Sequence, residues 1–288
     1  MNIDLLLGRP VKVDLEENTY TKTNFDGLYL KNYKLKDFLR SVGYDKYTSW
    51  CNMITMKPKD IADILWIKHK MYYKEIDDWE FLFSQCFDFK KQKPYENNPI
   101  LEGLKFMFGY EFSVSINTKG KSPEEIFFFN IYDENNRWLA KINKANFEKI
   151  IETIKLVNYI KPSELSTWNY AYEKHEKRAL KYFYEKRMKK ESKQDYEFNL
   201  ETIMRFLKLE THSTYEEMFG YSLYELYSCY SMKTDTFRAL ALNIGIYDGN
   251  IKMDSSIQNN LLFGIVKNEK QVKNIASGNG MENISVEN

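Results

Sequence analysis

The chain has 288 residues, of which 43% are hydrophobic and 16% aromatic, and its 42 basic residues nearly balance 41 acidic ones. This length allows one or two domains with a substantial core, and a formal net charge of +1 excludes a protein that binds polyanions over its whole surface. The aromatic excess is mostly Tyr and Phe, which suits a recognition surface and equally suits the codon bias of an AT-rich genome.

We expect no signal peptide, because Asp4 precedes an apolar run of only three residues. No stretch reaches the roughly 20 apolar residues of a membrane helix, so we expect a soluble protein that is intracellular when made. The cysteines are odd in number and widely spaced in aromatic or apolar surroundings, which predicts buried free thiols at Cys51, Cys86 and Cys229.

The first hundred residues are predicted to be mostly helical with short strands. Residues 1–13 are expected to be extended and broken at Gly8 and Pro10, and residues 28–30 offer a second short strand. Apolar residues then recur at helical spacing in four segments, and Pro58 and Asp77 occupy positions typical of helix starts. The four predicted helices cover residues 35–42, 44–54, 58–69 and 77–86.

In the middle of the chain the spacing of the apolar residues changes from helical to alternating. Apolar residues occupy every second position between Gly103 and Ile116, which predicts one long strand with a single buried face. Its alternating residues are Leu104, Phe106, Phe108, Tyr110, Phe112, Val114 and Ile116. Two further strands are predicted at residues 125–132 and 138–142, and a helix over residues 145–159 is expected to pack across this antiparallel meander.

After Pro162 the chain is predicted to be helical again. A long helix is expected within residues 163–193, a second over residues 200–209, and a short third one over residues 215–219, opened by a capping box of Thr214 and Glu217. A last helical stretch covers residues 222–244, and the polar composition from Lys267 onward predicts a disordered tail.

The predicted fold is therefore α+β, predominantly helical, with a small antiparallel β-meander inserted in the middle. Along the chain this gives an N-terminal mostly helical region with short strands (residues 1–99), a β-meander plus helix (100–160), a helical region (161–266) and a disordered tail (267–288).

No catalytic or metal-binding pattern is found in the sequence. The three histidines lie far apart, and the segment that begins His175-Glu176 carries Ala179 where a zinc protease has its second His. Phosphate-binding loops and nucleophile motifs are missing, and the carboxylate pair Asp77 and Asp78 lies where a helix start favours acidic residues. We therefore predict a protein that is not an enzyme and has no catalytic residue, metal or cofactor.

Residues 170–193 are rich in basic side chains, and the predicted basic face consists of Lys174, Arg178, Lys181, Arg187 and Lys190. Four glutamates interleave with these bases at spacings of three and four, which favours ion pairs within the helix. We predict a solvated or protein-binding face, since each carboxylate would repel a phosphate backbone. Nucleic-acid binding through this helix remains the strongest alternative.

Four tyrosines recur at every third position, at Tyr221, Tyr224, Tyr227 and Tyr230. On a helix they drift by roughly 60° per step, so they cannot all be buried equally. We predict that some of them bind a partner in a groove or form an oligomer contact. The alternative is a Tyr-rich face that only covers the basic helix.

The chain contains five short motifs: LLLGRP at residues 5–10, GYDKY at 43–47, KDIADIL at 59–65, RALK at 178–181 and YSLYELY at 221–227. With these motifs the chain resembles tail assembly chaperones and other tail morphogenesis proteins of phages and prophages of low-GC Gram-positive bacteria. The resemblance does not extend to residues 100–142.

The resemblance implies a non-enzymatic protein that shields apolar helices of a tail protein, such as the tape measure or tail tube protein, by helix-in-groove contact. It implies action in the host bacterial cytoplasm during assembly, without membrane or nucleic acid. The alternatives are a nucleic-acid-binding phage protein that uses the basic helix, and a structural tail or baseplate component.

Overall fold

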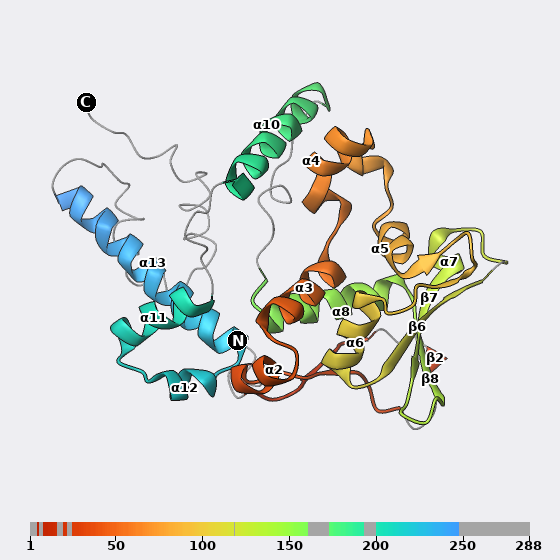
Figure 1. Cartoon of the computed structure of the whole chain (residues 1–288), viewed down its shortest axis with the longest axis horizontal. Helices are drawn as coiled ribbons and strands as arrows, with labels where there is room; N and C mark the ends of the chain where they lie inside the picture. The colour runs from red at the N-terminus through yellow and green to blue at the C-terminus, as the bar shows by residue number, and fades with distance from the viewer. Residues whose placement is uncertain are drawn as a thin grey trace. The chain divides into compact units, whose positions relative to one another are not determined.

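A computed structural model describes residues 5, 8–15, 20–21, 25–117, 119–160, 173–192 and 200–247. They belong to two compact units: unit 1 contains the described residues up to 192 together with 219–224, and unit 2 contains 200–218 and 225–247. Figure 1 labels the elements. The predicted fold class is confirmed, because the chain is α+β and mostly helical with small antiparallel sheets.

Unit 1 is built around a four-stranded antiparallel sheet. Its strands lie in the order β2 (Tyr20–Thr21), β8 (Trp138–Ile142), β7 (Phe127–Tyr132) and β6 (Glu111–Ile116). The pairing of β6 with β7 runs from Glu111 opposite Tyr132 to Ile116 opposite Phe127. Strands β6, β7 and β8 therefore form the predicted meander, and β2 adds a fourth strand that the sequence did not indicate.

The prediction of one long strand from residue 104 is wrong in its first half, which is the helix α6 (Pro99–Phe108). Asn98 caps this helix by accepting hydrogen bonds from the backbone N–H groups of Ile100 and Leu101, and Gly109 ends it at φ 77°. Its buried residues Ile100, Leu104, Met107 and Phe108 follow helical spacing. The predicted strand at 125–132 likewise begins with a helical turn, α7 (Pro123–Ile126).

Two helices pack against one face of the sheet through aromatic rings. These are α5 (Asp78–Cys86) and α8 (Lys144–Val157), both close to their predicted positions. Phe83 stacks on Phe127 with ring centroids 4.4 Å apart, and Phe147 stacks on Phe129 at 4.5 Å. Phe127 and Phe129 are two positions apart on β7, so they share a face, and both helices therefore cover it.

A second aromatic cluster joins three helices, α2 (Leu35–Ser41), α3 (Tyr44–Thr55) and α6. Phe38 stacks on Tyr47 at 4.7 Å, and the rings of Trp50 and Phe106 lie 5.6 Å apart. Gly103 permits this close approach, because a Cβ atom there would lie 2.8 Å from the Cβ of Trp50. The predicted helices at 35–42 and 44–54 are confirmed.

Short strands complete the N-terminal half of unit 1. Strand β1 (Val11–Lys12) lies within the predicted extended segment and β3 (Tyr29–Leu30) overlaps the second predicted short strand. The two strands pair with each other, and β4 (Phe87–Asp88) pairs with β5 (Lys93–Pro94). The helix predicted from Pro58 does begin there, but it changes geometry twice. Its parts are the 3₁₀ turn η1 (Pro58–Ile61), α4 (Ala62–Ile64) and the π-helical turn η2 (Leu65–His69), followed by the 3₁₀ turn η3 (Tyr73–Glu75).

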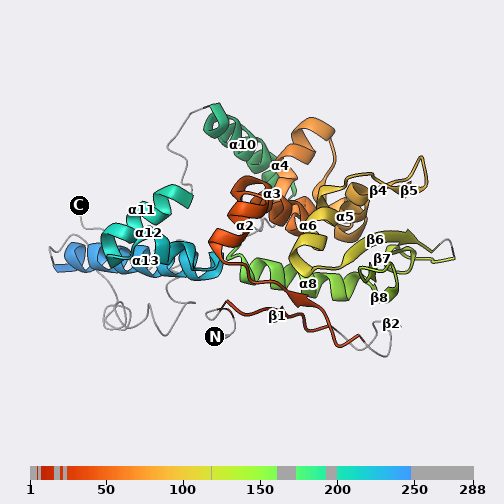
Figure 2. The same cartoon turned by 60° about the horizontal axis from the view of Figure 1, so that its bottom comes forward.

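Unit 1 also contains the long charged helix α10 (Glu173–Ser192). Both views show it beside α4 (Figure 1, Figure 2). The earlier part of this predicted helix, residues 163–172, and the predicted tail, residues 267–288, lie outside the described residues.

Unit 2 is a helical hairpin of α11 (Leu200–Thr211) and the part of α13 (Leu223–Tyr247) from residue 225 onward, and the short helix α12 (Tyr215–Phe219) lies between them in sequence. The ring of Phe206 lies 5.3 Å from that of Tyr230 and 6.1 Å from that of Phe237. The predicted capping box is present, because the Thr214 N–H donates to the Glu217 carboxylate at 2.7 Å and the Glu217 N–H donates to Thr214 Oγ1 at 3.2 Å.

Every helix in the described part of the chain is too short or too polar to cross a membrane. Cys51 and Cys86 are buried free thiols, as predicted, whereas Cys229 is only half-buried. Burial raises the pKa of both buried thiols to about 12.

Candidate functional site

Helix α10 is held against α4 and η2 by few apolar contacts. The buried apolar cluster consists of Ala62, Leu180 and Phe183, with Trp66, Tyr73 and Ala179 packed around it. Most other side chains of α10 are charged. Its attachment therefore depends on polar contacts, and two buried carboxylates provide them.

The first buried carboxylate belongs to Asp63, which is fully buried. Arg187 donates to both of its oxygens, from Nε and from Nη2, each at 2.8 Å. This two-pronged geometry is the strongest form of the Arg–carboxylate interaction. Arg187 was predicted on the basic face, but its guanidinium is directed at a buried partner and takes little part in a solvated surface.

The second buried carboxylate belongs to Glu176, which is only 4% exposed. It accepts hydrogen bonds from the Tyr73 hydroxyl and from Lys74 Nζ, both at 2.7 Å, and a further short one from the Tyr72 hydroxyl. Burial opposes ionisation of Glu176, but the hydrogen bonds from Lys74, Tyr72 and Tyr73 outweigh it and lower the pKa of the carboxyl. Burial, together with the hydrogen bond to Glu176, raises the pKa of Tyr73 to about 12.

These contacts change the interpretation of the interleaved glutamates. Glu173 does pair with Lys177 one turn along the helix, as predicted. Glu176 instead turns inward to residues about a hundred positions earlier in the chain. Its charge therefore does not neutralise the outward face of α10.

An open groove of about 570 Å³ lies between η2 and α10, which we call the cationic groove. It is lined by Trp66, Ile67, Glu173, Lys174, Lys177, Arg178 and Lys181. Lys177 Nζ lies 4.4 Å above the Trp66 ring, in addition to its ion pair with Glu173. The predicted basic-face residues Lys174, Arg178 and Lys181 are thus brought together, while the side chain of Lys190 lies outside the described part of the structure.

The four predicted partner-binding tyrosines are all half-buried, and they are divided between the two units. Tyr221 and Tyr224 belong to unit 1, where the Tyr221 carbonyl accepts from the Leu35 N–H at 2.8 Å and Tyr224 packs edge-on against a neighbouring ring. Tyr227 and Tyr230 belong to unit 2, where Tyr230 contacts Phe206.

Unit 2 exposes large apolar side chains that sequence patterns did not single out. Leu209 is 76% exposed at the end of α11, and Phe237 and Leu240 on α13 are 44% and 43% exposed. Phe206 links the two helices, because it lies one turn before Leu209 and its ring contacts Phe237. We call Phe206, Leu209, Phe237 and Leu240 the apolar stripe.

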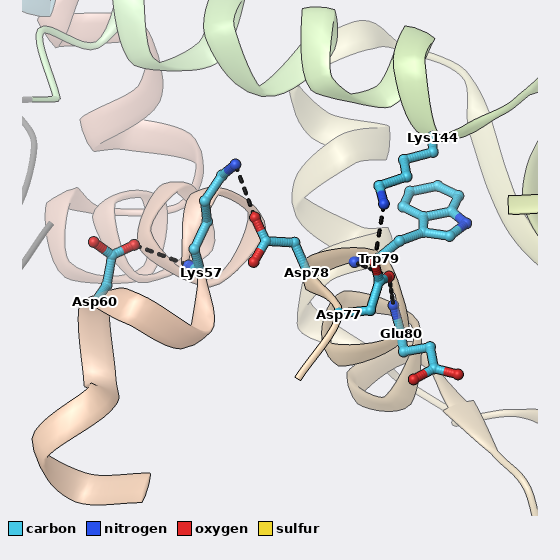
Figure 3. Close-up of polar contacts among 7 residues, drawn as sticks. All are labelled: Lys57, Asp60, Asp77, Asp78, Trp79, Glu80 and Lys144. Atoms are coloured by element: carbon cyan, nitrogen blue, oxygen red, sulfur yellow. Dashed lines mark hydrogen bonds and ion pairs between the residues drawn. The ribbon is translucent and has the colours of Figure 1, made fainter. Parts of the chain in front are cut away.

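The acidic pair at the start of α5 has a structural role, as predicted (Figure 3). Asp77 accepts from the backbone N–H groups of Trp79 and Glu80 and pairs with Lys144 Nζ at 2.9 Å. Asp78 pairs with Lys57 Nζ at 2.9 Å. Among the described residues, no group of three or more His, Cys, Asp or Glu side chains is placed to hold a metal ion.

Comparison with models of known protein families, with curated proteins and with solved structures finds no match in any of the three.

Proposed function

We propose that the protein is a non-enzymatic tail morphogenesis factor of a phage or prophage, similar to the tail assembly chaperones. In this proposal it binds an apolar helix of a tail protein, such as the tape measure or tail tube protein, in the host bacterial cytoplasm until assembly. The short motifs listed above support the family, and the exposed apolar stripe of unit 2 is the observation that carries the binding role.

The apolar stripe has the chemistry of a helix-binding surface. Leu209, Phe237 and Leu240 present leucine and phenylalanine side chains to solvent on two helices of a hairpin, so a partner helix can lie along them. Full burial of one such side chain stabilises a complex by about 1.5–3 kcal/mol. Phe237 and Tyr230, whose rings both lie near Phe206, belong to the aromatic residue types that are enriched at protein interfaces.

Co-expression with the tape measure and tail tube proteins of the same phage tests this role. The full chain should retain one of them in a pull-down, and Leu209→Glu should abolish retention because it places a charge in the contact. Leu156→Glu is the matched control, since Leu156 on α8 of unit 1 is also an exposed leucine at 47%. Retention of neither tail protein, or equal loss with both variants, would contradict the proposal.

Two alternatives remain. A permanent tail or baseplate component would be found in purified virions, whereas an assembly chaperone would be missing from them. A nucleic-acid-binding phage protein is favoured by one observation, the cluster of exposed cations in the cationic groove.

A further inference from the structure

We infer that the cationic groove binds an acidic amphipathic helix of a partner protein. The carboxylates of that helix would lie on Lys174, Arg178 and Lys181, and its apolar side chains on Trp66 and Ile67. This surface belongs to unit 1 and goes beyond the proposed function, which depends on the apolar stripe of unit 2.

The positive charge of the groove favours a negatively charged ligand. Lys177 is neutralised by Glu173, but Lys174, Arg178 and Lys181 are exposed and form no ion pair with any residue that the structure describes. Like charges one turn apart on a helix destabilise it, so this arrangement weakens α10 unless a ligand offsets it. Burial of Glu176 adds to the imbalance, because a carboxylate that could have neutralised this face is turned inward.

The spacing of the three cations fits a helix. They occupy positions i, i+4 and i+7 of α10, which covers about 10 Å along its axis. A partner helix with carboxylates at every turn repeats the same spacing. Glu185 lies on the same face about one turn beyond Lys181 and interrupts the positive stripe, which disfavours a phosphate backbone running along it.

The floor of the groove favours a protein over a nucleic acid. Trp66 and Ile67 are only partly buried and offer apolar contact beneath the cations. A base would bind by stacking on the Trp66 ring, yet Lys177 Nζ lies 4.4 Å from its centroid and occupies one face of the ring. Leucine side chains at the edges of an acidic helix can still contact Ile67 and the rim of the ring.

The position of α10 beside the groove is fixed by polar contacts within unit 1. The Asp63–Arg187 pair and the Glu176 hydrogen bonds attach α10 at two points, 11 residues apart in sequence number, on either side of the apolar cluster. The cations are therefore displayed on a helix whose position relative to η2 is fixed before a ligand arrives, which reduces the entropic cost of binding.

Fluorescence anisotropy with the full chain tests the inference. The probe is a labelled helical peptide of about 18 residues, roughly five turns, with Glu at each turn and Leu beside it. It should bind, and the same peptide with Lys in place of Glu should not. Binding should weaken as salt rises but persist, because salt screens the ion pairs and leaves the apolar contacts.

Charge reversal separates this groove from other basic surfaces. The double variant Lys174→Glu with Arg178→Glu should weaken peptide binding at least about tenfold. Lys36→Glu with Arg40→Glu is the matched control, because it reverses a Lys and an Arg one turn apart on the exposed side of α2. Ile67→Ser should weaken binding without changing its salt dependence.

Three results would overturn the inference. These are no binding of the acidic peptide, equal binding of the two peptides, or equal effects of the two double variants. Tighter binding of single-stranded DNA than of the peptide, lost in Lys174→Glu with Arg178→Glu, would assign the groove to nucleic acid. Circular dichroism of each variant distinguishes loss of binding from loss of fold, and Leu209→Glu should leave peptide binding unchanged.

Discussion

Arg187→Ala is expected to loosen α10 much more than Asp63→Ala. The Asp63 side chain is 0% exposed and that of Arg187 is 35% exposed. Removing Arg187 and removing Asp63 should therefore lower the stability by different amounts. Without Arg187, the Asp63 carboxylate is left buried with neither of its two charge-assisted hydrogen bonds. Without Asp63, the Arg187 guanidinium can turn to water.

Breaking a buried ion pair costs about 3–5 kcal/mol, and the partial exposure of Arg187 favours the lower end, about 3 kcal/mol. That corresponds to a change on the order of a hundredfold in the folding equilibrium. Asp63→Ala removes the same hydrogen bonds but strands no buried charge, so we expect about 1 kcal/mol. The double variant should resemble Asp63→Ala, because the stranded carboxylate is then absent.

Urea unfolding measures the global effect, and hydrogen exchange of the α10 amides measures local release of the helix. Faster exchange confined to α10 in Arg187→Ala would place the effect at this attachment. The reasoning is refuted if Asp63→Ala destabilises at least as much as Arg187→Ala, or if Arg187→Ala costs less than about 1 kcal/mol.

Three further substitutions test other parts of the structure. Glu176→Gln should reduce the pH dependence of stability, because the pKa of Glu176 is lowered in the folded state. The contribution of this carboxylate to folding stability is complete above roughly pH 4.3 and is lost as pH falls through the folded-state pKa. Urea unfolding of both proteins above and below that pH checks this. Gly103→Ala should destabilise by about 1–3 kcal/mol, because the new Cβ would lie 2.8 Å from Trp50; helix propensity alone predicts the opposite sign. Thr214→Ala should cost about 1 kcal/mol in thermal unfolding through loss of its hydrogen bond with the Glu217 N–H, and an unchanged midpoint would exclude that role.

A start signal together with a helical apolar stripe predicts a helix correctly where no alternating apolar pattern competes with it. Helix α5 has Asp77 as its cap and buries Trp79, Leu82 and Phe83, and it was predicted correctly. Helix α6 has equally clear signals, since Asn98 and Pro99 begin it and Gly109 ends it. The sequence analysis misses this helix because its apolar residues lie at every second position and continue the alternating pattern of the following strand. That pattern predicts a strand, whereas the capping residues indicate a helix.

The candidate site could be predicted only in part. The cations of α10 are visible in the sequence, but their partners are not, because Glu176 bonds to Tyr73 across 103 positions and Arg187 bonds to Asp63 across 124. Spacing within one helix indicates only contacts along that helix. It therefore identified the Glu173–Lys177 pair and could not show that the neighbouring glutamate turns inward.

The pairing of β2 with β8 affects the order in which the protein can fold during synthesis. Tyr20 lies opposite Lys141 and Thr21 opposite Ala140, so β2 leaves the ribosome roughly 120 residues before its partner, on the order of ten seconds at usual elongation rates. A chain that lacks residues 1–24 would still contain both candidate surfaces, but one edge of β8 would be unpaired. Unpaired strand edges recruit strands from other chains, so such a truncated protein is expected to aggregate through β8.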